Sequence, residues 1–166
     1  MIKIVSEKLI ATIIAIFFSC IIKFSVLASE NKILLKVNNE PITTIDILNE
    51  ISYLKSINKN ISNLENNKLF EIARNSLIKD KIKLITLVAV VEKIEISDED
   101  YKRILISNYS DTGFTKTAEI YKYLQKYDLK PNLIRNKMTL NAIWSQFIYE
   151  KFSKNIKIDI DRLKKR

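Results

Sequence analysis

The stretch KVNNEPITTIDI, Lys36 to Ile47, contains two adjacent asparagines, one of the chain's two prolines and a threonine–aspartate pair. It follows Ile33–Val37, a short apolar run with the composition of a strand. Asn38 and Asn39 tolerate the positive φ of a tight hairpin turn. Pro41 lacks an N–H donor and therefore favours a strand start or a sheet edge. The stretch predicts that the chain reverses here.

A helix is predicted to begin directly after this reversal. Thr43 and Asp46 have the spacing of a capping box, in which each side chain bonds the other residue's backbone N–H. The residues that follow are apolar at helical spacing, at Ile47, Leu48, Ile51, Leu54 and Ile57. The segment Lys59–Asn67 is polar and rich in asparagine, which predicts a loop.

The longest helical pattern covers Lys68–Lys93. Towards its end, ITLVAVV at Ile85–Val91 is apolar on every side of a helix. A helix without a polar face is expected to be surrounded by other parts of the protein. We therefore expect Ile85–Val91 to be the most buried part of the domain.

Three further helices are predicted after this one. Ser97 and Asp100 form a second capping pattern, which opens a short helix that reaches about Tyr109. The next helix has its apolar positions at Ile120, Tyr121, Leu124 and Tyr127. The last helix is expected at about Pro131–Lys154, because the fixed φ of proline suits a first helical turn.

The tail NIKIDIDRLKKR alternates Ile156, Ile158 and Ile160 with polar residues, the period of a half-buried strand. We expect this strand to pair with Ile33–Val37. The predicted fold is therefore mainly α, a single helical domain at residues 29–166 with a short β pairing of the chain ends. An unpaired edge on the tail strand would also favour a homodimer by strand exchange.

Residues 1–28 have the pattern of a secretory signal peptide. Leu9–Ile22 is an uninterrupted uncharged run preceded by lysines, and Val26-Leu27-Ala28 supplies small residues for cleavage. One alternative is a retained membrane anchor, although a spanning helix needs about 20 apolar residues. Another is lipidation at Cys20, which the continuing apolar run disfavours. Cleavage after Ala28 is the preferred interpretation.

The composition excludes several kinds of chemistry. The chain has no histidine, and its single cysteine, Cys20, lies within the predicted signal peptide. Histidine- or cysteine-dependent nucleophiles and zinc sites are therefore not expected in the processed domain. We predict no cofactor and no metal, and a mechanism using carboxylates alone stays open at this point.

The net charge of +9 raises the question of nucleic acid. Removal of residues 1–28 would leave +7. The lysines are spread along every segment and are not interleaved with aromatic residues, as a nucleic-acid surface would require. We predict a solvated basic surface that attracts acidic clients or, transiently, anionic lipid headgroups.

Two acidic groups could be interpreted as functional carboxylates. Asp98-Glu99-Asp100 resembles a metal cluster, but its place at a helix start favours interaction with the helix dipole. Asp159 and Asp161 share one face of the predicted tail strand, without a third ligand nearby. A structural role is the preferred interpretation of both groups.

The order of these elements resembles the N-terminal domain of SurA-type periplasmic chaperones. That family begins with a pattern similar to V-V-N-x-E-P-I-T-x-x-D-[LIV], represented here by Leu35–Ile47. Its pattern I-x-[VI]-[ST]-D-E-E-[VI] is represented by Ile94–Tyr101, and its threonine cap by Phe114-Thr115. Its last helix is matched at Arg135, Met138, Ala142, Trp144, Phe147 and Ile148. The resemblance covers nearly all of Lys32–Ile160.

Two departures from the family are visible. Asp128 and Leu129 stand where the family commonly has a glycine that closes the helix before the last one. The sequence ends at Arg166, where a parvulin isomerase domain would normally begin, so no isomerase active site is carried over.

The resemblance implies a non-catalytic chaperone of the Gram-negative periplasm that binds unfolded outer-membrane proteins through apolar surface. The alternative is a membrane-anchored helical adaptor that binds one folded partner. Aromatic residues are natural candidates for client contacts, because rings bury area at low entropic cost. They are Tyr121, Tyr123, Tyr127, Trp144 and Phe147. We expect Trp144 and Phe147 to fill the core and Tyr123 to be exposed, and no single client-binding residue is assigned.

Overall fold

The computed structural model of the protein describes residues 31–153. These residues form a mainly helical unit, as predicted, and their one sheet is a two-stranded antiparallel hairpin of β1 and β2. The elements are β1 (Ile33–Val37), β2 (Glu40–Thr43), α2 (Thr44–Ile57), α3 (Asn66–Val88), α4 (Asp98–Asn108), α5 (Thr117–Gln125) and α6 (Pro131–Phe152), with short 3-10 turns η1 (Lys59–Asn63) and η2 (Ser110–Thr112). The predicted signal peptide lies outside the described residues.

The chain reverses at the two asparagines, and β1 pairs with β2. Val37 is opposite Glu40, and Asn38 has a φ of 54°, the left-handed conformation expected of a hairpin turn. Pro41 lies opposite Lys36 in a sheet of only two strands, where its missing donor is tolerated. The predicted partner of β1, the tail strand at Ile156–Ile160, lies outside residues 31–153, so that prediction stays untested.

The capping box at the start of α2 is confirmed. Thr43 Oγ1 accepts a hydrogen bond from the Asp46 N–H at 3.3 Å. Asp46 Oδ2 in return accepts one from the Thr43 N–H at 2.8 Å. The hairpin therefore leads into α2 without a linker, which fixes the direction of the helix.

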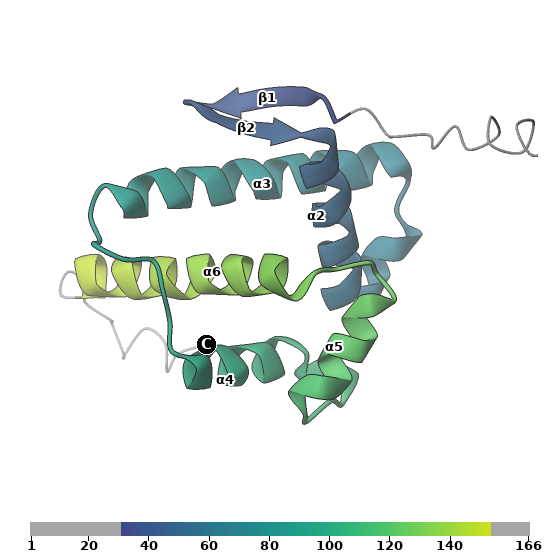
Figure 1. Cartoon of the computed structure of the whole chain (residues 1–166). Helices are drawn as coiled ribbons and strands as arrows, with labels where there is room; N and C mark the ends of the chain where they lie inside the picture. Colours follow the sequence, from purple (N-terminus) through teal and green to yellow (C-terminus); the bar gives the residue numbers. More distant parts are fainter. Residues whose placement is uncertain (1–30, 154–166) are drawn as a thin grey trace, which may run out of the picture. The chain divides into compact units, whose positions relative to one another are not determined.

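The elements are arranged in layers (Figure 1). The helices α3 and α6 run side by side, and the hairpin lies on the side of α3 that faces away from α6. α4 packs on the other side of α6, and α2 crosses α3 near the hairpin.

Two buried clusters hold these layers together. The smaller cluster joins the hairpin to α2 and α3 through Ile42, Ile47 and Ala73. The larger cluster joins the C-terminal half of α2 to α4, α5 and α6, and its members are Tyr53, Tyr101, Leu105, Tyr109, Ile120, Leu124, Leu129, Ile134 and Met138. Leu54 of α2 packs against both clusters. α2 is therefore shared by the two cores.

The prediction that Ile85–Val91 is the most buried segment is wrong. α3 ends at Val88, and of this segment Leu87 is fully buried while Val88 and Val90 are 66% and 56% exposed. Only one side of this last turn packs on other described residues. A helix that is apolar on every side is fully buried only where neighbouring elements cover every side.

The other predicted helix boundaries agree with the structure to within a few residues. Ser97 caps α4, and its hydroxyl accepts the Asp100 N–H at 3.0 Å. Pro131 occupies the first turn of α6. Asp128, at the position where the resemblance led us to expect glycine, adopts a φ of 55°, so an aspartate occupies the left-handed position.

Candidate functional site

A groove of about 680 Å³ lies among α2, α3 and the first half of α6. Each helix contributes residues three or four apart, which lie on one helical face. Its apolar lining comes from Ile42, Leu77, Leu84, Ile94, Leu133 and Leu140. Its polar lining includes the amide side chains of Asn49, Asn132 and Asn136. The groove has the size and mixed lining of a site for a small ligand or a short peptide segment.

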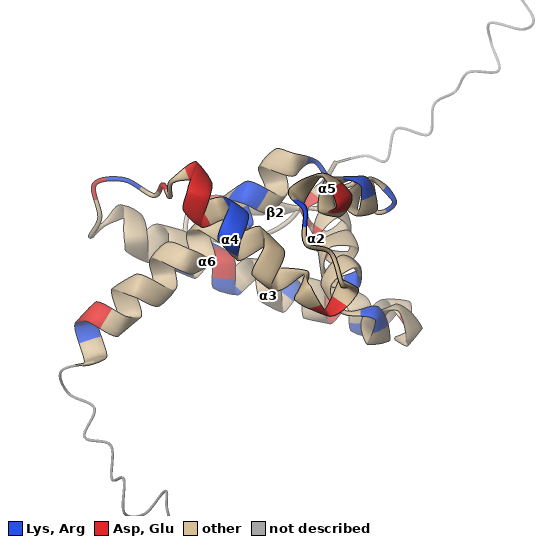
Figure 2. Ribbon diagram, turned by 90° about the horizontal axis from the view of Figure 1, so that it is seen from below, with Lys and Arg blue, Asp and Glu red and all other residues tan. Residues whose placement is uncertain are grey.

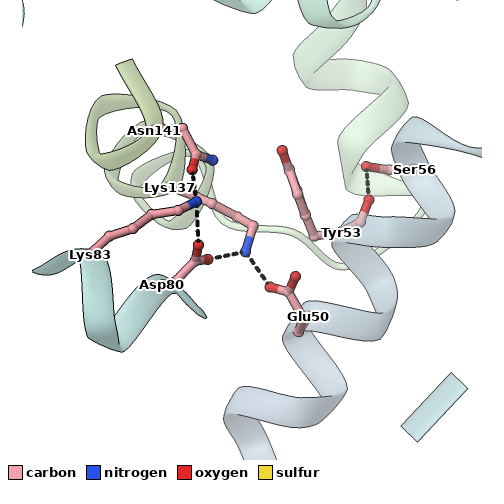
Figure 3. A network of polar contacts seen from close by, with 7 residues as sticks. All are labelled: Glu50, Tyr53, Ser56, Asp80, Lys83, Lys137 and Asn141. Carbon is pink, nitrogen blue, oxygen red and sulfur yellow. Dashed lines mark hydrogen bonds and ion pairs between the residues drawn. The ribbon is translucent and has the colours of Figure 1, made fainter. Parts of the chain in front are cut away.

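The groove also contains a buried network of charges (Figure 3). Lys137 Nζ donates to Glu50 Oε2 at 2.6 Å and to Asp80 Oδ2 at 2.5 Å. Lys83 pairs with the other oxygen of Asp80 at 3.2 Å and also donates to Asn141 Oδ1. The network therefore ties α2, α3 and α6 together at the groove.

Glu50 occupies an unusual position in this network. The residue is 3% exposed, and its Oε1 atom has no hydrogen-bond partner among the described residues. Figure 3 shows the carboxylate held through its other oxygen by Lys137. The Oε1 atom is closed to solvent, and a buried acceptor without a donor is energetically unfavourable.

Tyr53 lies beside the network, and the charges of the network affect the pKa of its phenol. Lys137 Nζ is 4.9 Å from the centre of the Tyr53 ring, close enough for a cation–π interaction. Burial, and then the charges of Glu50 and Asp80, raise the pKa of Tyr53 to about 12. Burial likewise raises the pKa of Tyr109 to about 12, against the opposing effect of its hydrogen bond with Ser56.

These two tyrosines predict a loss of stability at alkaline pH. Their pKa values of about 12 exceed the value near 10 for an unfolded chain, so the folded state holds both protons more tightly. The contribution is fully present below about pH 10 and disappears as the pH rises towards 12, at up to about 1.4 kcal/mol per pH unit for each tyrosine. Urea unfolding followed by circular dichroism at several pH values would measure the slope.

Tyr53→Phe provides the control for this prediction, because it removes one of the two buried phenols. Its stability should fall less steeply with pH than that of the unaltered chain. Parallel slopes for the two proteins would contradict the assignment to Tyr53.

The charges on the groove lining balance one another. The lining contains three carboxylates, on Asp46, Glu50 and Asp80, and three ammonium groups, on Lys81, Lys130 and Lys137. Residues 29–166 contain neither cysteine nor histidine. Among residues 31–153, no three Asp, Glu, Cys or His residues gather closely enough to bind a metal ion. The arrangement can bind an uncharged group by apolar contact and hydrogen bonding.

The acidic run at the start of α4 has a structural role. Asp100 accepts from the Ser97 hydroxyl at 2.7 Å and pairs with Arg103, and these hydrogen bonds lower the pKa of Asp100. Asp98 pairs with Arg135 of α6 at 2.6 Å. Asp98, Glu99 and Asp100 all lie in the first turn of α4, the position that the helix-start interpretation predicted. Asp159 and Asp161 lie outside the described residues.

The tyrosines proposed as client contacts lie against the larger cluster. Tyr123 was predicted to be exposed, but it is half-buried. Its hydroxyl donates to the Ser56 carbonyl at 3.0 Å and forms a hydrogen bond with the Tyr127 hydroxyl. Its ring packs on Phe114 as well as on Tyr127. Tyr121 donates to the Tyr101 hydroxyl at 3.3 Å. Helical spacing alone predicted that Tyr123 lies outside the apolar face of its helix, but residues from other parts of the fold pack against it at that position.

Trp144 and Phe147 were predicted to fill the core, but they are more exposed than core residues. They are half-buried and belong to neither buried cluster of residues 31–153. Their ring centres are 5.7 Å apart, and Lys151 lies over the Phe147 ring. The pair packs on itself along α6, so part of its surface faces solvent.

The basic and acidic residues are interspersed over the described helices, as Figure 2 shows. This distribution agrees with the solvated basic surface predicted from sequence.

The network at Glu50, Asp80 and Lys137 was missed by sequence analysis. A sign of it was available, because each residue stands among the apolar positions of its own helix. Glu50 lies three residues after Ile47, Asp80 three after Leu77 and Lys137 three after Ile134. A charge on an apolar helical face requires a partner when the face is buried.

No helix within residues 31–153 has the length and apolar character needed to cross a membrane. Comparison with known proteins gives no further assignment, since no family model, curated protein or solved structure matches the chain.

Proposed function

We propose that the domain is a non-catalytic chaperone module that binds unfolded polypeptide, with unfolded outer-membrane proteins as its clients. The observation that supports this proposal best is the groove among α2, α3 and α6, with its apolar lining and balanced charge. The sequence resemblance to the SurA-type N-terminal domain supplies the class of client.

Features of the described residues support this proposal. Binding an unfolded segment must offset the entropy lost when that segment is ordered, which requires apolar contact area. The groove supplies such area, and Leu48, Ile82 and Tyr149, which do not line the groove, are also exposed to solvent. Interspersed charge keeps a protein with exposed apolar groups dispersed.

The proposal places the processed domain in the periplasm of a Gram-negative bacterium, because residues 1–28 have the pattern of a signal peptide. It assigns no bond chemistry and no cofactor. A prolyl isomerisation assay on a proline-containing tetrapeptide should show no rate above background.

The competing proposal is a tethered adaptor, favoured by the uncharged run at Leu9–Ile22 if that run is retained as an anchor. Mass spectrometry of the native protein separates the two proposals. An N-terminus at Ser29 supports the exported chaperone, whereas an intact Met1 supports the adaptor.

The chaperone proposal is tested with a urea-unfolded outer-membrane barrel diluted into buffer with and without the purified chain. We expect the chain to slow the rise of light scattering in proportion to its concentration. Lysozyme at equal concentration serves as a control for a small basic protein. Scattering curves that coincide in all three mixtures would rule out the proposed function.

A further inference from the structure

The last turns of α6 project from the rest of the described unit. α3 and α6 run side by side in the same direction, as the order of colours along them shows (Figure 1). Asp80 pairs with Lys137, 57 positions later, so the end of α3 at Val88 is level with about residue 145. α6 continues from there to Phe152, and Figure 2 shows this end projecting away from the neighbouring helices.

This projecting end carries an apolar stripe. The stripe recurs at helical spacing along one face and consists of Trp144, Phe147, Ile148, Lys151 and Phe152. None of these residues belongs to a buried cluster of residues 31–153, and Phe152 is 45% exposed. The Nζ atom of Lys151 lies 5.3 Å from the ring centre of Phe147 and 5.8 Å from that of Phe152. The lysine therefore extends along the rings while its charged end stays at the surface.

The residues beside the stripe carry polar groups. Ser145, Gln146 and Glu150 are exposed, and Gln146 donates to Glu150 at 2.8 Å. Tyr149 is 72% exposed and adds a ring with a polar tip. The end of α6 is therefore amphipathic, with an aromatic apolar face. This composition is typical of helices that lie in the interface of a lipid bilayer.

The charge along this part of the chain indicates which kind of surface suits it. Residues 150–166 contain seven lysines and arginines against three acidic residues, a net charge of +4. Basic residues next to an apolar helical face attract a bilayer that carries anionic headgroups. A second copy of the chain would bring a second set of basic residues to the same place, where like charges repel. The charge therefore favours an anionic bilayer over self-association.

We propose that Trp144, Phe147, Ile148 and Phe152 seat this end of α6 on the surface of an anionic lipid bilayer. The rings lie at the boundary between headgroups and acyl chains, and Lys151 pairs with headgroup phosphates. This contact lies outside the groove and does not depend on the proposed function.

The first test uses the fluorescence of Trp144, which is the chain's only tryptophan and therefore reports on this surface without a label. The unaltered chain is mixed with vesicles of phosphatidylglycerol and phosphatidylcholine, and with vesicles of phosphatidylcholine alone. We expect the first vesicles to shift the emission to shorter wavelength, and the same vesicles with brominated acyl chains to quench it. Affinity for phosphatidylcholine alone should be at least about tenfold weaker, because the attraction of the basic residues is lost. Attachment through the apolar run at residues 9–22 would not by itself bring the quencher to Trp144.

The second test is Phe152→Ser, which removes a partly exposed ring from the stripe. We expect this variant to bind the anionic vesicles at least about fivefold more weakly, because it loses apolar area that the bilayer would bury. Phe70→Ser is the matched control, since Phe70 is 38% exposed near the start of α3. Its affinity should stay within about twofold of the unaltered chain.

The third test reverses one charge. Lys151→Glu should weaken binding to the anionic vesicles at least about fivefold, because it places a negative charge beside the headgroups. Lys122→Glu makes the same change in net charge on α5. In about 0.1 M salt, charges more than about 10 Å from the bilayer are largely screened, so this control should have a smaller effect.

Three outcomes would overturn the inference. The first is the absence of binding to the anionic vesicles. The second is binding that leaves the emission of Trp144 unshifted and unquenched, which would show that another part of the chain is attached. The third is a dimer in sedimentation equilibrium whose Trp144 emission does not respond to vesicles, which would show that a second copy covers the stripe. The barrel-aggregation assay contains no lipid, so its failure bears on the proposed function alone. If a variant does not fold, quenching in the unaltered chain still decides.

Discussion

Replacement of Lys137 by methionine is expected to lower the free energy of unfolding by about 3–5 kcal/mol, the typical effect of leaving a buried charge without its partner. Lys137 is the cation that contacts both Glu50 and Asp80, and Glu50 is 3% exposed. Asp80 keeps Lys83, whereas Glu50 loses the partner of its Oε2 atom. Urea unfolding at neutral pH measures the change directly.

Two further variants establish the cause of this effect. Lys79→Met makes the same substitution at an exposed position of α3 and should change stability by less than about 0.5 kcal/mol. Glu50→Leu combined with Lys137→Met should recover most of the loss, because a buried ion pair exchanged for apolar groups is often neutral in stability. A double variant as unstable as Lys137→Met alone would show that the loss comes from packing and not from unpaired charge.

The second large effect is expected at Leu105 of α4. This side chain is 0% exposed and belongs to the larger cluster, and its helix packs against both α5 and α6. Leu105→Ala should lower the free energy of unfolding by about 2–5 kcal/mol, the sum of lost apolar burial and the cavity that remains. The shift of the urea midpoint at constant slope measures it.

Leu48→Ala is the matched control for this prediction. Leu48 lies on α2 and is 52% exposed, so the same atoms are removed where solvent already reaches them. Its effect should stay within about 0.5 kcal/mol. Equal losses at Leu48 and Leu105 would contradict the division between core and surface described above.

Local sequence patterns predicted the parts of the fold that depend on neighbouring residues. The hairpin turn at Asn38, the capping pairs at Thr43 and Ser97, and Pro131 at the start of α6 all depend on residues within one turn of the chain. Backbone stereochemistry and local hydrogen bonds decide such features before any packing is known. These boundaries could therefore be predicted from sequence.

Features that depend on packing between distant segments were predicted less well. The Lys137–Glu50 contact joins residues 87 positions apart, which no local pattern encodes. Val88 was expected to be buried because its neighbours in sequence are apolar. Tyr123 was expected to be exposed because its position lies off the apolar face of its helix. Their burial is decided by which helices pack against them. The groove has the same origin, since its three walls come from α2, α3 and α6.

The sharing of α2 between the two cores bears on how the domain opens. Ile47, near the start of this helix, belongs to the smaller cluster, and Tyr53, further along it, belongs to the larger one. Release of α2 would expose both clusters to water at once. The free energy needed to release this helix alone should therefore be close to that of complete unfolding. Slowly exchanging amide protons should therefore be found along this helix, with exchange rates that follow global stability. The helix α2, which forms one wall of the groove, is thus also the element whose release would unfold the domain as a whole.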